Sequence, residues 1–357
     1  MALVFFVLGL GLLVLGAELL VRGASKLALT FGISPLVVGL TVVAFGTSAP
    51  EVAVSVQSAV SGQTEIAVGN VVGSNIFNVL FILGLSALIT PLLVNRQLIR
   101  QEVPVMAAIS LLMAALAWDG ELSRIDGVLF IALLVAYTVF VIVQSRRTQS
   151  EAEEQTADSS APGWDSKLPV QLVLIAVGLG MLVLGARWLV SAAITFATYL
   201  GVSEMIIGLT VVAAGTSLPE VATSVMAALR GERDIAVGNV VGSNIFNILG
   251  VLGLSATVAP GGLVVPPAMI AFDIPVMLAV AFACLPIFFT GNLIARWEGG
   301  FFFALYVAYT TYLILAAKEH DALSTYGFVL GTVVLPLCAI TIVIIAWREW
   351  QSRHPSA

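Results

Sequence analysis

Two stretches of sequence, each present twice, decide the fold of this chain. Residues 39–51 read GLTVVAFGTSAPE and residues 208–220 read GLTVVAAGTSLPE, so 11 of 13 positions are identical. Residues 66–78 and 235–247 share the sequence IAVGNVVGSNIFN. Both pairs of copies lie 169 positions apart. Such a repeat means that the chain is built from two homologous halves.

The sequence around these repeats is apolar along almost its whole length. Of its 357 residues, 59% are hydrophobic and 10% are charged, whereas an ordinary soluble domain has about 25% charged residues. This composition excludes a soluble enzyme. The alternating pattern of membrane-spanning strands is absent, which excludes an outer-membrane barrel. We predict an all-α polytopic membrane protein.

Eleven apolar runs are predicted to cross the membrane, because a spanning helix needs about 20 mostly apolar residues. They cover residues 2–22, 35–60, 66–88, 103–118, 127–144, 168–190, 204–229, 235–257, 268–289, 299–317 and 324–347. The polar, acidic segment 145–167 interrupts the series and is expected to be a flexible linker.

These runs divide the chain into a first five-helix repeat (1–144), the linker (145–167), a second five-helix repeat (168–317), and an extra eleventh helix with a tail (318–357). Five is an odd number, so the second half must be inverted in the membrane relative to the first. Inverted repeats are typical of secondary transporters, whose site lies near the midplane where the two halves meet.

Basic residues predict the orientation, because Lys and Arg concentrate in cytoplasmic loops. With the N-terminus outside, 12 of the 15 basic residues fall on the cytoplasmic side, and Arg124 and Lys318 fall outside. Arg187 lies within the sixth predicted span. We expect a multi-pass protein of the plasma membrane, of the prokaryotic inner-membrane type, with a cytoplasmic linker and C-terminus.

Two carboxylates, Glu51 and Glu220, lie deep within predicted spans. A charged group at that depth is costly unless it faces a cavity or a partner, so it indicates function. No Lys or Arg is predicted at a depth where it could pair with either glutamate, and we expect a transported cation to supply the charge. Protonated glutamates can also join helices by hydrogen bonds, but their recurrence within a repeated motif argues against that role.

Oxygen-bearing groups surround both glutamates. Hydroxyl side chains three and four positions before each glutamate share its helix face; they are Thr47, Ser48, Thr216 and Ser217. Pro50 and Pro219 lack the backbone N–H that a helix needs. We therefore expect each helix to break there and to free carbonyl oxygens, among them those of Ala44 and Ala213.

The second repeated motif adds a serine and an asparagine four positions apart in each half, Ser74 with Asn78 and Ser243 with Asn247. Carboxylate, amide, hydroxyl and carbonyl oxygens are the ligands that calcium takes, in flexible sets of six to eight. Thiolate and imidazole ligands for transition metals are missing from these motifs. The residues therefore predict a site for a hard cation.

The paired GTSAPE and GTSLPE motifs, each followed by GNVVGSNIFN, resemble the two alpha repeats of the calcium/cation antiporter superfamily. Within it, residues 1–317 are similar to the prokaryotic sodium/calcium exchangers. The resemblance implies ten helices in two inverted halves, with the first and sixth helices sliding to alternate access. It also implies calcium and sodium as transported ions.

Carried over by position, the resemblance implies that calcium is held by Glu51, Glu220 and carbonyl groups near Thr47 and Thr216. The implied sodium ligands add Ser48, Ser74, Ser217, Ser243, Asn78 and Asn247. We expect no cofactor, no nucleic acid and no required protein partner, only the bilayer and the ions. The linker is too short for the large cytosolic regulatory domain of animal exchangers, so we expect no such calcium regulation.

One departure leaves the coupling ion open. Known exchangers of this group carry Asp at one of the positions of Asn78 and Asn247, whereas both are amides here. A proton/calcium antiporter that uses the same glutamates is therefore the nearest alternative, and a cation channel is a more distant one. An enzyme is not expected, since HExxH, GxSxG and Ser/Lys arrangements are missing at membrane depth.

Overall fold

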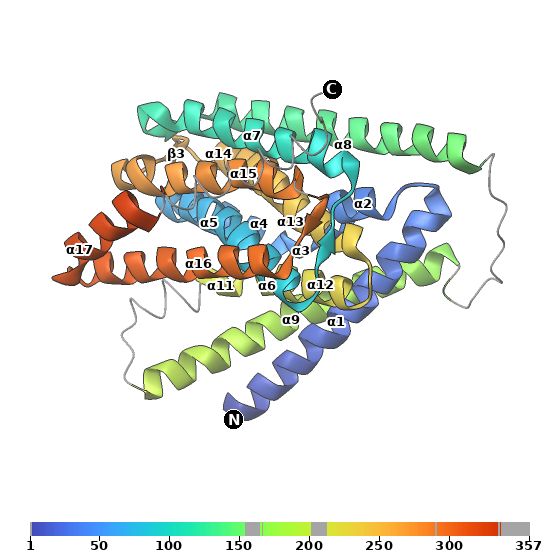
Figure 1. The fold of residues 1–357 in the computed structure, drawn as a ribbon, viewed down its shortest axis with the longest axis horizontal. Coiled ribbons are helices and arrows are strands. Elements are labelled where there is room, and N and C mark those ends of the chain that lie inside the picture. The colour runs from blue at the N-terminus through green and yellow to red at the C-terminus, as the bar shows by residue number, and fades with distance from the viewer. Residues whose placement is uncertain are drawn as a thin grey trace, which may run out of the picture.

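The computed structural model describes residues 2–153, 165, 167–200, 213–289, 291–334 and 336. These residues form a helical bundle in which the long helices α1 (Ala2–Phe31) and α9 (Leu168–Tyr199) cross at one edge (Figure 1). Eight described helices are long and apolar enough to cross a membrane, or nine if one bent pair counts as a single span. The predicted all-α membrane fold is confirmed.

The second and third spans of the first half carry its repeated motifs. The second span consists of α2 (Pro35–Val38), the π-helical turn η1 (Gly39–Val43), α3 (Ala44–Thr47) and α4 (Ala49–Val60). The third consists of α5 (Thr64–Phe77), the π-helical turn η2 (Asn78–Leu83) and α6 (Gly84–Ile89). The rest of this half comprises strand β1 (Leu92–Leu93), η3 (Leu98–Glu102), α7 (Val103–Leu116), η4 (Ala117–Asp119), strand β2 (Glu121–Leu122) and α8 (Arg124–Glu153).

The second half begins with α9 and repeats the same order. Its motif-bearing elements are α11 (Ala213–Gly215), α12 (Leu218–Leu229), α13 (Arg233–Phe246), the π-helical turn η7 (Asn247–Leu252) and α14 (Gly253–Val258). They are followed by β3 (Leu263–Val264), η8 (Met269–Asp273), α15 (Ile274–Phe289), β4 (Leu293–Ile294), α16 (Arg296–Ala317), α17 (Ala322–Val329) and η9 (Leu330–Val334). Residues 208–212 of the repeated motif lie outside the described part of the chain.

The two halves interlock rather than pack as separate blocks. Strand β1 pairs antiparallel with β4, and β2 pairs antiparallel with β3, so each small sheet joins the halves. Helix α6 packs on α16, α8 on α14, and α13 on η1. The motif-bearing helices are thereby enclosed. All 18 residues of the most apolar window of the span formed by α13, η7 and α14 are buried in the protein.

Glycines set the contact between α1 and α9, which run antiparallel. A Cβ atom at Gly16 would lie 2.8 Å from the carbonyl oxygen of Gly178, and one at Gly9 would lie 2.9 Å from that of Gly185. Lipid tails are as apolar as the side chains, so close backbone approach through small residues is what holds membrane helices together. Only glycine permits this approach here.

Helix α1 and helix α9 are longer than predicted. The expected ends were residue 22 and residue 190, whereas the helices continue to Phe31 and Tyr199. Arg22 does not end α1, because arginine is a good helix former and its Nε donates to Oδ2 of Asp165 at 2.9 Å. Helix α8 likewise continues to Glu153, so residues 145–153 of the expected linker are helical.

The described part of the predicted eleventh helix forms α17 and η9, and residues 337–347 of that prediction lie outside the described residues. Helix α17 packs on α16, where the Tyr326 hydroxyl donates to the Ala308 carbonyl at 3.0 Å.

Candidate cation site

The second span breaks at Ser48, as its proline predicts. The helix axis bends by 47° between the segments Pro35–Thr47 and Ala49–Val60. Pro50 occupies the first turn of α4. Glu51 falls in that first turn, as Glu220 falls in the first turn of α12. The N-terminus of a helix carries partial positive charge, which favours a carboxylate there. Both glutamates are buried.

The two glutamates are each bound by the other half of the chain. Ser217 donates to Oε1 of Glu51 at 2.7 Å, and Ser48 donates to Oε1 of Glu220 at 2.9 Å. The Ser217 hydroxyl also lies 3.3 Å from that of Ser74. These contacts place both repeated motifs in one site between the halves.

Two pairs of asparagines from the second repeated motif are hydrogen-bonded to each other across the two halves. Asn78 donates through Nδ2 to Oδ1 of Asn244 at 3.0 Å, and Asn247 donates to Oδ1 of Asn75 at 3.1 Å. Asn78 and Asn247 each begin a π-helical turn, a distortion that is frequent at functional sites. Both side chains act as donors through their nitrogens, and their Oδ1 atoms have no hydrogen-bond partner within the described residues.

Five oxygens of the predicted ligand residues are buried and accept or donate no hydrogen bond within the described structure. They are Glu51 Oε2, Glu220 Oε2, Asn78 Oδ1, Asn247 Oδ1 and Ser243 Oγ. A buried carboxylate oxygen without a partner is strongly unfavourable. The set has the composition of a calcium or sodium site, with two carboxylate, two amide and one hydroxyl oxygen.

The two threonines of the motifs lie beside the site with different exposure. Thr47 is buried and donates to Oδ1 of Asn239 at 3.1 Å. Thr216 is half-buried, and its hydroxyl lies 3.5 Å from Oδ1 of Asn70. The carbonyl oxygen of Ala44 accepts from the Ser48 N–H at 3.0 Å, so the break does not leave it without a partner. Ala213 begins the described part of α11.

Two cavities lie beside the site. We call the end where the linker joins α9 the linker side, which is on the right in Figure 1, and the opposite end the far side. One cavity, of about 540 Å³, lies between α4 and α9 and reaches Thr216. The other, of about 520 Å³, runs along α5 and α16 to Ser74 and Thr216. The residues of α9 and α16 that line them belong to the far-side halves of these helices, so both cavities lie on the far side.

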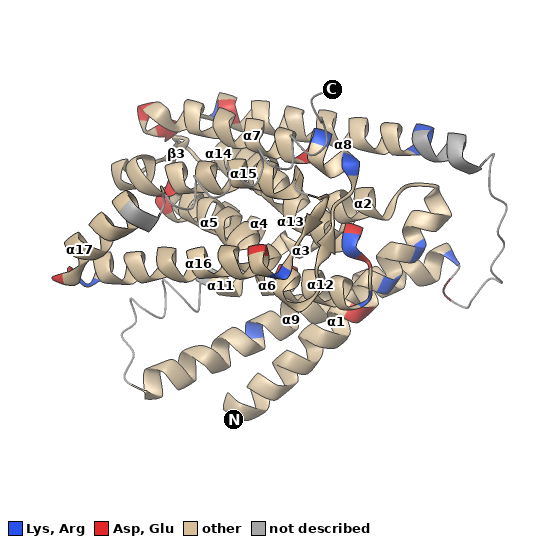
Figure 2. Ribbon diagram, in the orientation of Figure 1, with Lys and Arg blue, Asp and Glu red and all other residues tan. Residues whose placement is uncertain are grey.

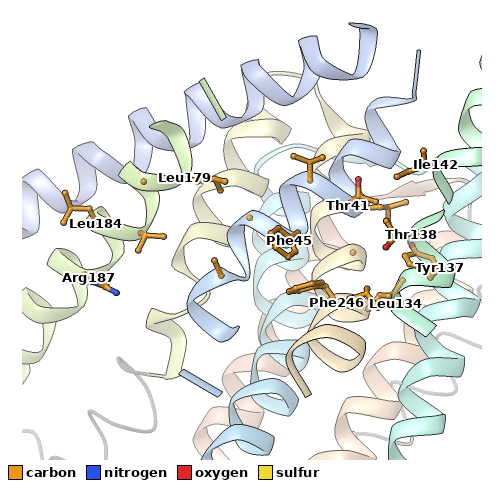
Figure 3. A pocket seen from close by; sticks show the side chains of 18 residues that line it. Thr41, Phe45, Leu134, Tyr137, Thr138, Ile142, Leu179, Leu184, Arg187 and Phe246 are labelled. Atoms are coloured by element: carbon orange, nitrogen blue, oxygen red, sulfur yellow. The ribbon is translucent and has the colours of Figure 1, made fainter. Parts of the chain in front are cut away.

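A larger cavity of about 800 Å³ lies apart from the carboxylates (Figure 3). Figure 3 shows Tyr137 and Thr138 of α8 on one side of it and Leu184 and Arg187 of α9 on the other. Phe45 and Phe246 meet edge to face between them, with ring centroids 5.1 Å apart. Its lining includes none of the predicted ion ligands.

Two further asparagines of the repeated motif make equivalent contacts in the two halves. The amide of Asn70 donates to Ser55 at 2.9 Å, and Asn239 donates to Ser224 at the same distance. Sequence reasoning missed a repeated carboxylate–tyrosine contact, in which Tyr137 donates to Glu102 and Tyr309 donates to Asp273, both at 2.7 Å. The signal for this pattern was the weaker repeat of EVPVM at 102–106 as DIPVM at 273–277.

The two glutamates are not joined by a third acidic, histidine or cysteine side chain within the described residues. Across the described residues, no group of three or more His, Cys, Asp or Glu side chains is placed to hold a metal ion. The site therefore depends on amide and hydroxyl oxygens as well as on its two glutamates.

Comparison with known proteins gives matches along most of the chain. The inner membrane protein YrbG of Escherichia coli is 42% identical over 286 residues, which are 79% of this chain and 86% of YrbG. The sodium/calcium exchanger MaX1 of Methanosarcina acetivorans is 34% identical over 343 residues, covering 87% of this chain and 97% of MaX1. The putative antiporter CaxA of Alkalimonas amylolytica is 39% identical over 287 residues, covering 80% of this chain and 88% of CaxA.

Solved structures agree with the sequence matches. The structure of the sodium-calcium exchanger NCX_Mj superposes with a TM-score of 0.73 at 32% identity, covering 86% of this chain and 96% of NCX_Mj. The expected ten-helix exchanger fold with inverted repeats agrees with this likeness. The model of the sodium/calcium exchanger protein family matches residues 1–143 and 170–315. The chain is thus a membrane transporter and not an enzyme, and it belongs to the sodium/calcium exchanger protein family.

Proposed function

We propose that this protein exchanges calcium for sodium across the membrane by alternating access, with Glu51 and Glu220 as the central cation ligands. The observation that carries this proposal is the set of five buried oxygens that the described structure leaves without hydrogen-bond partners. They belong to residues from both halves and to the residue types that bind hard cations. In this proposal, bound cations supply the partners that these oxygens lack.

The charge of the site supports exchange rather than one-way flow. Two carboxylates are neutralised by one calcium ion or by two sodium ions. When neither ion is bound, moving the charged pair through the membrane interior costs several kcal/mol. The empty protein is therefore slow to change sides, which couples the movement of one ion to that of the other. If three sodium ions move per calcium ion, one net charge crosses, worth about 2.3 kcal/mol per 100 mV.

Residues of the motifs act as one binding shell in this proposal. Calcium is held by the glutamates with carbonyl groups near Thr47 and Thr216, and sodium by the glutamates with the serines and asparagines. The further sodium ligands are Ser48, Ser74, Ser217, Ser243, Asn78 and Asn247. Glycines bring α1 and α9 into close backbone contact, which suits sliding of the two helices as one unit past the rest of the bundle.

We further propose that the linker side is cytoplasmic and that the N-terminus lies outside. In Figure 2 most of the blue residues lie toward the right, the linker side, while the bodies of the helices are largely uncharged. Positive charge concentrates in cytoplasmic loops, which supports this orientation. The described conformation would then be open to the outside.

Uptake of radioactive calcium into proteoliposomes tests the coupling ion. Vesicles loaded with sodium are diluted into sodium-free buffer at matched pH, and a parallel set carries a pH gradient without sodium. Uptake that requires the sodium gradient and disappears in Glu51→Gln is the expected result.

Uptake that follows the pH gradient and ignores sodium would contradict sodium coupling and would establish proton/calcium antiport at the same glutamates. Because positions 78 and 247 both hold amides, proton coupling is the main alternative to sodium coupling. Unitary currents in a planar bilayer would contradict both carrier schemes, because a carrier moves only the ions bound in each cycle.

A further inference from the structure

Helices α1 and α9 are repeat equivalents, yet they pack differently on the rest of the bundle. The linker-side half of α1 packs along α12, whereas a cavity of about 540 Å³ separates α9 from α4 at the equivalent place. Leu27 of α1 is 5% exposed, and its equivalent in α9, Phe196, is 38% exposed. The structure is therefore closed between these helices on the linker side and open on the far side.

Polar contacts hold the closed end together. Arg230, at the end of α12, forms an ion pair with Glu18 of α1. About two turns of α1 further on, Ser25 donates to Oε1 of Glu232 at 2.8 Å. Both partners of α1 lie in the short connection between α12 and α13. The two contacts tie the linker-side half of α1 to the motif-bearing helices.

The repeat predicts where equivalent contacts would form on the far side, but the residues there cannot make them. The positions equivalent to Glu18 and Arg230, at the offset of 169, are Arg187 and Ser61. Those equivalent to Ser25 and Glu232 are Ile194 and Gln63. Neither far-side pair can form an ion pair, and Ile194 has no hydroxyl to donate.

We propose that the Glu18–Arg230 ion pair, together with the Ser25–Glu232 hydrogen bond, is a one-sided latch that favours the state closed on the linker side. The proposal rests on the alternating access proposed above. A contact made in one of two states shifts their equilibrium by its own free energy. The mirror state, closed on the far side by α9 and α4, gains no such contact, so the cycle is biased toward the state open to the far side.

Cysteine labelling measures this bias without any transport. Cys284 and Cys338 are first replaced by alanine. Ala53→Cys then reports on the far-side cavity, which Ala53 lines, and its repeat equivalent, Ala222→Cys, reports on the equivalent position of α12. Each single-cysteine protein is purified in nanodiscs, and its reaction rate with a hydrophilic maleimide is measured in sodium-free and calcium-free buffer.

Removing the latch by Glu18→Gln or Arg230→Gln should raise the labelling rate at residue 222 and lower it at residue 53. Partly exposed ion pairs are worth little, so the expected change is roughly two- to fivefold. The exchanged pair Glu18→Arg with Arg230→Glu should return both rates toward those of the parent. This restoration separates a latch from general loosening of the fold.

Installing the latch on the far side is the converse test. The double variant Arg187→Glu with Ser61→Arg should lower the labelling rate at residue 53 and raise it at residue 222. Arg187→Glu alone should change both rates by a smaller factor. Unchanged rates in the Glu18 and Arg230 variants, or no restoration by the exchanged pair, would overturn the proposal. Failure of sodium/calcium exchange in vesicles would instead contradict the proposed function and leave these labelling results intact.

Discussion

Ser217 donates a hydrogen bond to Oε1 of Glu51 at 2.7 Å across 166 positions of sequence, and so joins the two halves at the site. Its repeat equivalent, Ser48, makes the mirror contact with Glu220 at 2.9 Å. Each glutamate thus has one oxygen held by the opposite half and one oxygen, Oε2, without a partner among the described groups. The hydrogen bonds fix where the second oxygens point.

Replacing either serine should weaken cation binding by misplacing the opposite glutamate. A hydrogen bond to a charged group is worth about 1.5–3 kcal/mol, which corresponds to a loss of affinity of roughly ten- to 150-fold. Calcium titration of purified Ser217→Ala and Ser48→Ala measures this loss. Ser110→Ala is the control, because Ser110 donates to the Met106 carbonyl within its own helix and should leave binding unchanged. Equal affinity in all three variants would contradict the role of the two serines.

Ser243 and Ser255 provide a matched pair on one span. Both hydroxyls are buried and have no hydrogen-bond partner within the described residues, but only Ser243 belongs to the predicted site. We expect Ser243→Ala to reduce sodium affinity by roughly tenfold, the change for about 1.4 kcal/mol. Ser255→Ala should leave transport unchanged, since it removes no bond. Sodium dependence of calcium uptake distinguishes the two, and equal behaviour would remove Ser243 from the site.

Gly16 and Gly11 test the contact between α1 and α9. A Cβ atom at Gly16 would lie 2.8 Å from the Gly178 carbonyl oxygen, whereas one at Gly11 would have no described atom within 4 Å. Gly16→Ala should lower the free energy of unfolding by about 1–3 kcal/mol through overpacking, and slow transport more than it lowers ion affinity. Gly11→Ala should be neutral or stabilising, since alanine favours helix. Thermal unfolding and uptake rates of both variants check this, and a harmless Gly16→Ala would contradict the close contact.

The repeated motifs predicted most of the fold, and they supplied the candidate residues of the site. The prolines beside Glu51 and Glu220 predicted the helix break, because a residue without an N–H cannot continue the ladder. The doubled motif predicted that two inverted halves meet. The four-residue spacing of Ser74 and Asn78 placed both on one helix face. In the structure, Ser74 contacts Ser217, which donates to Glu51, and Asn78 donates to Asn244.

Other features depend on contacts between distant segments and could not be predicted. Nothing in the local sequence says that Arg22 meets Asp165, so the length of α1 was underestimated. The pairing of Glu102 with Tyr137 depends on the packing of two helices. The difference between the linker side and the far side depends on how α1 and α9 pack on the bundle. The repeat alone predicts equivalent packing of these two helices and therefore no difference between the sides.

Calcium binding by the purified protein tests the central claim most directly. Equilibrium dialysis with radioactive calcium, at matched protein concentration, compares the parent with Glu51→Gln, Glu220→Gln and Glu102→Gln. Glu102 is an equally buried carboxylate whose oxygens already accept hydrogen bonds from Tyr137, Gln97 and Gln101. We predict one calcium ion per chain in the parent and in Glu102→Gln, and binding lost in both other variants. Full binding in Glu51→Gln or Glu220→Gln would contradict the assignment of these glutamates as the cation site.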